Sequence, residues 1–147
     1  MHRPRPHADF DPDQLVTSLQ IEIPGTVDAI SPAVSRVLET ARTLACAIGK
    51  EFEIEVAVRE ALANAIRHGC RNDPGKTVQL CVACDEARGM LIVVRDPGPG
   101  FDPARIASPT IGQNVFRHHG RGIYLINELM DEVTFHEGGT EIRMVKR

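Results

Sequence analysis

Glu60 and Asn64 are the residues whose types and spacing most clearly suggest chemistry in this sequence. They lie four residues apart in VREALANAIRHG, residues 58–69, which otherwise has the alanine-rich composition of a buried helix. Residues at this spacing share one face of a helix. A carboxylate and an amide oxygen so placed could together hold a magnesium ion, or one could hold the metal while the other takes a proton. An isolated glutamate and asparagine on one helix face more often form a solvated polar stripe. Here, however, the apolar residues around Glu60 and Asn64 leave only a narrow polar face.

Two short glycine motifs follow this helix along the chain. The first is DPGPGF at residues 96–101, and the second is GRG at residues 120–122, directly before a predicted helix. Glycines at a helix N-terminus let backbone N–H groups approach a phosphate, and the helix dipole favours negative charge there. Each motif alone is equally consistent with ordinary turns. The segment between them has little apolar periodicity, and segments of this length are usually functional or disordered.

The composition excludes several classes of protein. The chain has 147 residues, of which 42% are hydrophobic and 25% charged, values typical of a globular domain rather than a disordered or fibrous chain. A net charge of −3 does not indicate a general nucleic-acid or membrane-surface binder. No apolar run has membrane-spanning length, and the N-terminal residues lack the apolar centre of a signal peptide. We therefore expect a cytoplasmic protein.

The elements that would position these motifs can be predicted from periodicity and breakers. Residues 1–17, with three prolines, are predicted to be a flexible arm, and residues 18–147 a single domain. We expect a first helix that starts at Ser31-Pro32, with the serine as cap, and stops at Gly49. A second helix is expected over residues 51–68 and a third over 122–130. Strands are expected at 19–24, 77–84, 90–96, 132–137 and 140–146.

These elements are grouped by type along the chain rather than alternating. One strand precedes two helices, a strand pair follows, and a second strand pair comes after the third helix. Such grouping predicts an α+β fold, a two-layer sandwich of a mainly antiparallel sheet with helices on one face. The apolar face of the first helix is expected either to pack in the core or to form part of a dimer or partner surface.

The four cysteines do not indicate a metal site. Cys81 and Cys84 have the CxxC spacing, but they fall in a predicted strand, where residues three apart point to opposite faces. A zinc site would place its CxxC in a turn and need two further ligands. We expect free, mostly buried thiols.

Four segments, in their order and spacing, resemble a known family: EALAN at 60–64, DPGPGFDP at 96–103, GRGIYLINELMDEV at 120–133 and GGTEIRM at 138–144. They are similar to the ATP-binding domain shared by gyrase, Hsp90, histidine kinases and MutL, and most of all to the stand-alone anti-sigma-factor serine kinases. The resemblance runs from about residue 19 to 147 and implies a Bergerat-type ATP-binding fold that uses ATP and Mg²⁺.

The resemblance also implies roles for the first residues considered. Asn64 would coordinate the magnesium ion that bridges the phosphates. Glu60 would be the general base for a protein serine hydroxyl. Asp96 would accept a hydrogen bond from the adenine amino group and so select ATP over GTP.

The glycine motifs gain roles from the same resemblance. Gly98 and Gly100 would let the loop pass close to the base, and Thr140 would support the adenine pocket beside Asp96. Gly120, Arg121 and Gly122 would wrap the phosphates. Further cationic side chains of the segment before the third helix are candidates for a contact with the γ-phosphate: Arg105, Arg117, His118 and His119. His68 is interpreted as an ordinary histidine at a helix end.

As a function, the resemblance implies an ATP-dependent serine kinase that binds a sigma factor and phosphorylates a small antagonist protein, with no direct nucleic-acid or membrane contact. Members of that family are typically homodimers, and we expect the same here. Two alternatives stay open: an ATP-gated binding module with little phosphotransfer, which would not need Glu60, and a histidine-kinase catalytic domain acting in trans. Against the second, the chain has no helical hairpin carrying a phosphoacceptor histidine.

Overall fold

A five-stranded antiparallel sheet forms one layer of the molecule. The computed structural model describes residues 18–85, 87–100 and 120–147, with side chains described from residue 122 in the last range. The strands are β1 Leu19–Pro24, β2 Thr77–Asp85, β3 Gly89–Arg95, β4 Glu132–His136 and β5 Glu141–Lys146. Their order across the sheet is β1-β2-β3-β5-β4, and every neighbouring pair is antiparallel. Both predicted strand pairs are therefore confirmed.

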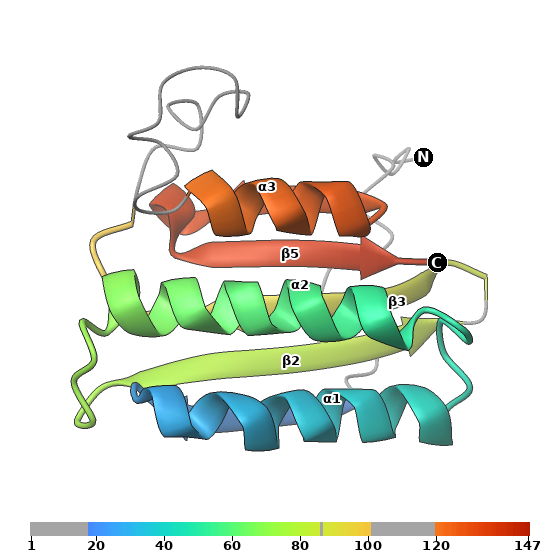
Figure 1. Cartoon of the computed structure of the whole chain (residues 1–147), viewed down its shortest axis with the longest axis horizontal. Coiled ribbons are helices and arrows are strands. Elements are labelled where there is room, and N and C mark those ends of the chain that lie inside the picture. The colour runs from blue at the N-terminus through green and yellow to red at the C-terminus, as the bar shows by residue number, and fades with distance from the viewer. Residues whose placement is uncertain (1–17, 86, 101–119) are drawn as a thin grey trace, which may run out of the picture.

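Three helices form the second layer, all on one face of the sheet. They are α1 Ile30–Thr43, α2 Glu51–Asn64 and α3 Gly120–Leu129, and Figure 1 shows them side by side in front of the strands, with α2 in the middle. Small residues on α2, among them Ala57 and Ala61, are buried and allow close packing against the sheet and both flanking helices. The α+β prediction is confirmed. None of the helices in the described ranges is long and apolar enough to cross a bilayer.

The main core lies between the two layers. Because side chains alternate along a strand, one set of strand residues faces the helices, including Leu80, Ile92 and Met144, none of which is exposed to solvent. Ile92 pairs with Met144 of β5, and Leu80 of β2 pairs with Val94 of β3, two residues along the same face. Each fully buried aliphatic side chain of this kind stabilises the fold by about 1.5–3 kcal/mol relative to its exposed state.

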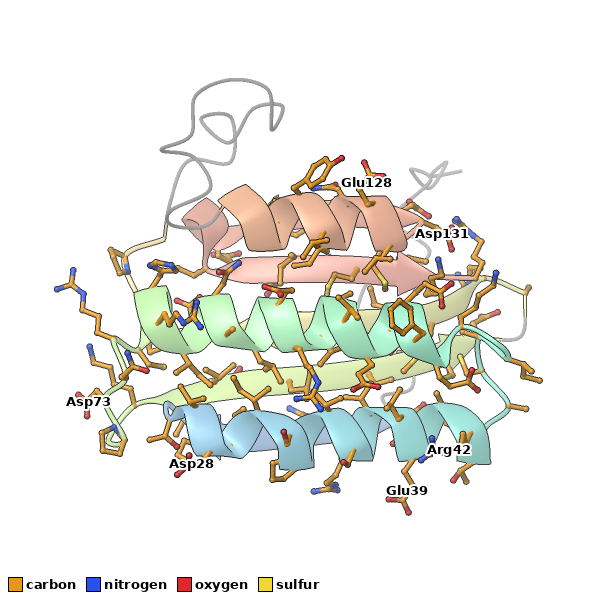
Figure 2. All side chains as sticks on the ribbon, viewed as in Figure 1. Asp28, Glu39, Arg42, Asp73, Glu128 and Asp131 are labelled. Carbon is orange, nitrogen blue, oxygen red and sulfur yellow. The ribbon has the colours of Figure 1, made fainter. Side chains whose placement is uncertain are left out.

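The first helix differs from its prediction at both ends. It begins at Ile30, one residue before Ser31, and no side chain caps it; the Ser31 hydroxyl instead accepts a hydrogen bond from Arg59 on α2 at 3.0 Å. It ends at Thr43 rather than at Gly49. The apolar face of α1 packs in the core, whereas Glu39 and Arg42 are exposed, and Glu39 points away from α2 (Figure 2).

The second helix changes its geometry directly after Asn64. The predicted α-helix over residues 51–68 is correct only to Asn64, and residues Ala65–Gly69 form a turn of π-helix, η3. π-helical turns inside α-helices occur often at functional sites. Gly69, at the end of this turn, lies against Asp96: a Cβ at Gly69 would collide with the Asp96 side chain. The wider turn therefore brings the end of α2 into contact with the segment after β3.

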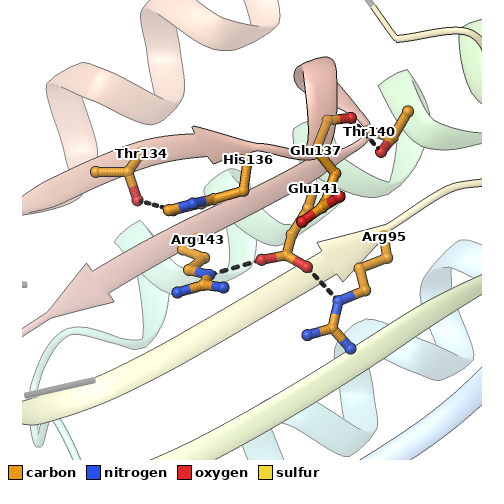
Figure 3. Close-up of polar contacts among 7 residues, drawn as sticks. All are labelled: Arg95, Thr134, His136, Glu137, Thr140, Glu141 and Arg143. Carbon is orange, nitrogen blue, oxygen red and sulfur yellow. Dashed lines mark hydrogen bonds and ion pairs between the residues drawn. The ribbon is translucent and has the colours of Figure 1, made fainter. Parts of the chain in front are cut away.

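A buried carboxylate joins β3 and β5 on the face of the sheet away from the helices. Glu141 is 3% exposed, and Figure 3 shows its carboxylate between the guanidinium groups of Arg95, its cross-strand partner, and Arg143. Arg143 Nε donates to Glu141 Oε2 at 2.6 Å, and Arg95 Nε donates to Oε1. Burial alone would raise the pKa of Glu141, but the hydrogen bonds and charges of the two arginines outweigh it and hold the pKa below its ordinary value.

Glu141→Gln is expected to destabilise the fold by about 2–3 kcal/mol near neutral pH, because it leaves two arginines without their shared carboxylate. A glutamate with a lowered pKa contributes stability that is present above its ordinary pKa and is lost as the pH falls through its folded-state pKa. The difference between wild type and variant in urea unfolding should therefore shrink on acidification.

Glu132→Gln is the matched control for that experiment. Glu132 pairs with Arg147, but its side chain is 28% exposed and that of Arg147 is 52% exposed. Its loss should cost less than about 1 kcal/mol. Equal effects of the two substitutions would contradict the role assigned to Glu141.

Candidate functional site

The ends of two neighbouring strands create the site. Asp96 directly follows β3 and Thr140 directly precedes β5, and because Arg95 pairs with Glu141 in an antiparallel register, the two residues lie side by side. The Asp96 N–H donates to the Thr140 carbonyl oxygen at 2.9 Å. The sheet register therefore joins two motifs that are 44 residues apart in the sequence.

A hollow opens at this point between the sheet and the end of α2. Predicted residues Asn64, Asp96, Gly100 and Thr140 all line it. Its other walls come from α2, η3, β3, α3, β4, the β4–β5 turn and β5, and most are apolar: Ala61, Ala65, His68, Gly69, Val94, Ile123, Phe135, Gly139 and Ile142. An apolar hollow with a few convergent polar groups is the usual form of a small-molecule site.

Asp96 has one oxygen already engaged by the backbone. The Gly98 N–H donates to Asp96 Oδ1 at 2.8 Å, and burial raises the pKa of this carboxyl despite that hydrogen bond. A Cβ at Gly98 would lie 2.5 Å from Gly69 Cα and 2.9 Å from Asp96 Oδ1, so only glycine fits this position without displacement. The carboxylate is therefore held in one orientation, with Oδ1 turned toward the loop and Oδ2 as its second acceptor.

Glu60 and Asn64 meet the start of α3. A Cβ added to Gly122 would lie 2.9 Å from Glu60 Oε2 and 3.2 Å from Asn64 Nδ2. The absence of a side chain at Gly122 therefore leaves room for both polar groups at the helix N-terminus. Glu60 and Asn64 are each partly buried, one helical turn apart on α2 as the sequence predicts.

The loop after Asp96 packs closely against the β4–β5 turn. Gly100 has φ +77°, in the left-handed region that favours glycine, and a Cβ there would collide with the Gly138 carbonyl group. Nearby, the Thr140 hydroxyl donates to the Glu137 carbonyl oxygen at 2.8 Å (Figure 3). Thr140 thus lines the hollow while its hydroxyl proton is directed to its own turn.

The second glycine motif lies inside a helix rather than before it. Gly120, Arg121 and Gly122 form the first turn of α3, because this helix begins two residues earlier than the sequence predicts. The side chain of Arg121 lies outside the described residues, as do Arg105, Arg117, His118 and His119.

Sequence patterns had not singled out the apolar walls of the hollow. Val94, Phe135 and Ile142 all face the helices from neighbouring strands. The alternation of apolar and polar residues in β4 and β5 was the available signal, whereas β3 is apolar from Met90 to Val94. Such alternation identifies the face of a strand that packs in the core, but not the point at which that face lines a pocket. His68, predicted to be an ordinary helix-end residue, also lines the hollow, because the π-helical turn brings it there.

Gly122→Ala is expected to separate stability from function. Alanine is favoured over glycine inside a helix by about 1 kcal/mol, so the midpoint of thermal unfolding should stay the same or rise. The new methyl group would displace the Glu60 carboxylate and crowd Asn64, so nucleotide binding measured by calorimetry should weaken. If the variant bound nucleotide as tightly as wild type does, α3 would not lie in close contact with Glu60 and Asn64.

The residues of the hollow suit a magnesium-bound nucleotide. The apolar walls match a planar base, and Asp96 Oδ2 offers an acceptor for its amino group. Carboxylate and amide oxygens are ligands that Mg²⁺ accepts, and the N–H groups of a helix N-terminus favour phosphate. Glu60 and Asn64 lie against Gly122 in the first turn of α3, and Asn64 and Asp96 both line the hollow.

Comparison with known proteins agrees with this chemistry. The family of histidine kinase-like ATPase domains matches residues 23–146. The serine-protein kinase RsbW of Staphylococcus epidermidis is 34% identical over 100 residues, which cover 63% of this chain and 62% of that protein. The anti-sigma F factor of Anoxybacillus flavithermus is 30% identical over 99 residues, 64% of this chain and 67% of that protein.

A longer match is found with the serine-protein kinase RsbW of Bacillus cereus strain AH820. It is 24% identical over 135 residues, which cover 87% of this chain and 83% of that protein. The match to the Staphylococcus epidermidis kinase, in contrast, spans less than two thirds of that protein's length.

Proposed function

The chain belongs to the family of histidine kinase-like ATPase domains, and on that premise we propose that it is an ATP-dependent protein serine kinase that acts as an anti-sigma factor. The names of its relatives, serine-protein kinase and anti-sigma F factor, support this proposal. Such a protein would bind a sigma factor and phosphorylate a small antagonist protein on serine.

The observation that carries the proposal is the meeting of Glu60, Asn64 and the start of α3 at one side of the hollow. The three features supply the needs of phosphoryl transfer: an oxygen ligand for magnesium, backbone N–H groups for phosphate, and a carboxylate to take the hydroxyl proton. A protein that only bound nucleotide would not need the carboxylate.

In this proposal each residue acts on a separate part of Mg-ATP. Asp96 accepts the adenine amino proton, with Gly98, Gly100 and Thr140 shaping the pocket around the base. The phosphates lie along the first turn of α3, at Gly120, Arg121 and Gly122, and Asn64 holds the magnesium ion. Glu60 accepts the proton of the substrate serine hydroxyl as that oxygen attacks the γ-phosphate.

The partners follow from the same proposal. The chain would silence the sigma factor by binding it, and the unphosphorylated antagonist would release the sigma factor from the chain. Phosphorylation of the antagonist would then restore silencing. We further propose that the chain works as a homodimer in the cytoplasm, where sigma factors act. The function needs no direct contact with nucleic acid or membrane.

Labelling with γ-phosphate tests the proposal. Purified wild type and Glu60→Gln are incubated with γ-labelled Mg-ATP and a lysate of the native host. We expect one small protein to carry acid-stable phosphoserine only with wild type. Acid-labile label would indicate a histidine kinase instead. No label, with Mg-ATP bound by both forms, would refute the kinase and favour an ATP-gated binding module.

A further inference from the structure

Two cysteines that are distant in the sequence meet at the end of the molecule away from the nucleotide hollow. Cys46 lies in the loop between α1 and α2, and Cys84 lies near the end of β2, on the side that faces the helices. Burial and the adjacent Cys46 side chain raise the pKa of the Cys84 thiol, so the two thiols lie close enough to interact. The α1–α2 loop precedes the first residue of α2, whereas the nucleotide hollow lies at the last residue of that helix.

The loop conformation directs Cys46 toward the sheet. Its neighbours Ala45 and Ala47 have φ of 51° and 52°, a left-handed conformation that is uncommon for residues other than glycine. The Cys46 N–H donates to the Ala41 carbonyl oxygen at 2.8 Å, which fixes the loop to the end of α1. Cys46 is 7% exposed as a result, although Ala45 before it is exposed and Ala47 after it is only partly buried.

A cavity gives small molecules access to both sulfurs. Cys46 and Cys84 line the same cavity of about 460 Å³, together with Leu44 and Ile48 of the loop and Arg147 at the chain end. A peroxide is much smaller than this volume. The pair is therefore internal to the fold but reachable from solvent.

We propose that Cys46 and Cys84 form an oxidation site at which a peroxide converts the two thiols into a reversible disulfide. This bond would tie the α1–α2 loop to the end of β2 and fix the start of α2 on the sheet. Oxidants of this class convert thiols to disulfides through a sulfenic acid.

The reaction balances in two steps. Burial, together with the neighbouring Cys46 side chain, raises the pKa of the Cys84 thiol to about 12, so Cys84 stays protonated near neutral pH. The Cys46 sulfur attacks hydrogen peroxide, which gives Cys46 sulfenic acid and water. The Cys84 sulfur then displaces the hydroxyl group, the disulfide forms and a second water leaves. Peroxide is reduced and two thiols are oxidised.

The other two cysteines are separated from this pair by the fold. Cys81 is only three residues from Cys84, but it belongs to a small buried cluster on the opposite face of the sheet, with Leu91 and Val93. This confirms that the CxxC spacing places its thiols on opposite faces. Cys70 follows η3, at the end of α2 where the nucleotide hollow lies.

Titration of thiols and peptide mapping test the proposal. The folded full-length chain is treated with hydrogen peroxide, alkylated in denaturant and digested without reduction. We expect free thiols to fall from the four of the untreated chain to two, one peptide pair linked through Cys46 and Cys84, and full recovery after dithiothreitol. A denaturing gel run without reductant should show single chains, with no disulfide between chains. The reaction should be slower than that of an exposed thiol, because Cys46 is buried and Cys84 is partly buried.

Cys84→Ser should abolish the linked peptide, whereas the matched variant Cys81→Ser should form it as wild type does. The wild-type map decides the matter even if a variant folds poorly. A link through Cys70 or Cys81, a link between chains, irreversible loss of thiols, or four thiols left unchanged after treatment would each overturn the assignment.

Discussion

Replacing Glu60 with glutamine is expected to lower the rate of phosphate transfer to the protein substrate by about 10²–10⁴-fold, the usual contribution of a positioned general base. Glutamine has nearly the same shape but cannot take a proton from the serine hydroxyl. Binding of Mg-ATP should be largely retained, because the substitution leaves unchanged both the adenine contact proposed for Asp96 and the amide of Asn64. The rate is measured in single turnovers with labelled Mg-ATP, and binding by calorimetry.

Glu53→Gln is the matched control for this substitution. Glu53 lies on the same helix, seven residues or about two turns earlier, so it shares the face of Glu60 but lies far from Gly122. Like Glu60 it is partly buried. Its loss should leave the transfer rate unchanged. If both variants transferred phosphate as wild type does, Glu60 would not be the base.

Replacing Asp96 with asparagine is expected to weaken ATP binding by about 10- to 100-fold, the result of leaving a buried donor without an acceptor. The Gly98 N–H already donates to Oδ1, so the asparagine carbonyl oxygen would take that position. The amide NH₂ group would then face the adenine amino group, donor against donor. The ratio of ATP affinity to GTP affinity should fall, because guanine has an acceptor at the position of the adenine amino group.

Asp73→Asn provides a control with the same local geometry. Asp73 is followed two residues later by Gly75, whose N–H donates to Asp73 Oδ1 at 2.8 Å, the same distance as between Gly98 and Asp96. Asp73 lies in an exposed turn outside the hollow (Figure 2). Its substitution should change neither affinity nor base preference. Unchanged ATP affinity in Asp96→Asn would contradict the placement of the adenine.

The sequence was sufficient for the type and order of the elements. Alternation in segments such as LQIEIP and the alanine-rich spacing of α2 are local signals, and each predicted strand and helix exists. The antiparallel sheet with helices on one face followed from the grouping of these elements.

Helix boundaries were predicted less well, because tertiary contacts decide them. Apolar periodicity continues past Thr43 through Leu44 and Ile48, but Ala45 and Ala47 leave the helical conformation and Cys46 turns into the core instead. Likewise, nothing local distinguishes residues 65–69 from the α-helix before them. Their π-helical turn brings Gly69 into contact with Asp96, a residue that is distant in the sequence.

For the candidate site, motifs identified the polar residues but not the architecture around them. Asn64, Asp96, Gly100 and Thr140 were predicted from motifs and do line one hollow. Outside the site, the buried carboxylate of Glu141 was also missed, because its partnership with Arg95 exists only through the register of β3 with β5. A glutamate within a strand gives no sign of burial until its cross-strand neighbour is known.

A crystal structure with Mg²⁺ and a non-hydrolysable ATP analogue would test the central claim most directly. We expect the adenine amino group within hydrogen-bond distance of Asp96 Oδ2, the magnesium ion about 2.0–2.1 Å from Asn64 Oδ1, and the γ-phosphate beside Glu60 at the start of α3. An analogue bound elsewhere, or bound here with its γ-phosphate directed away from Glu60, would contradict the kinase mechanism proposed for this chain.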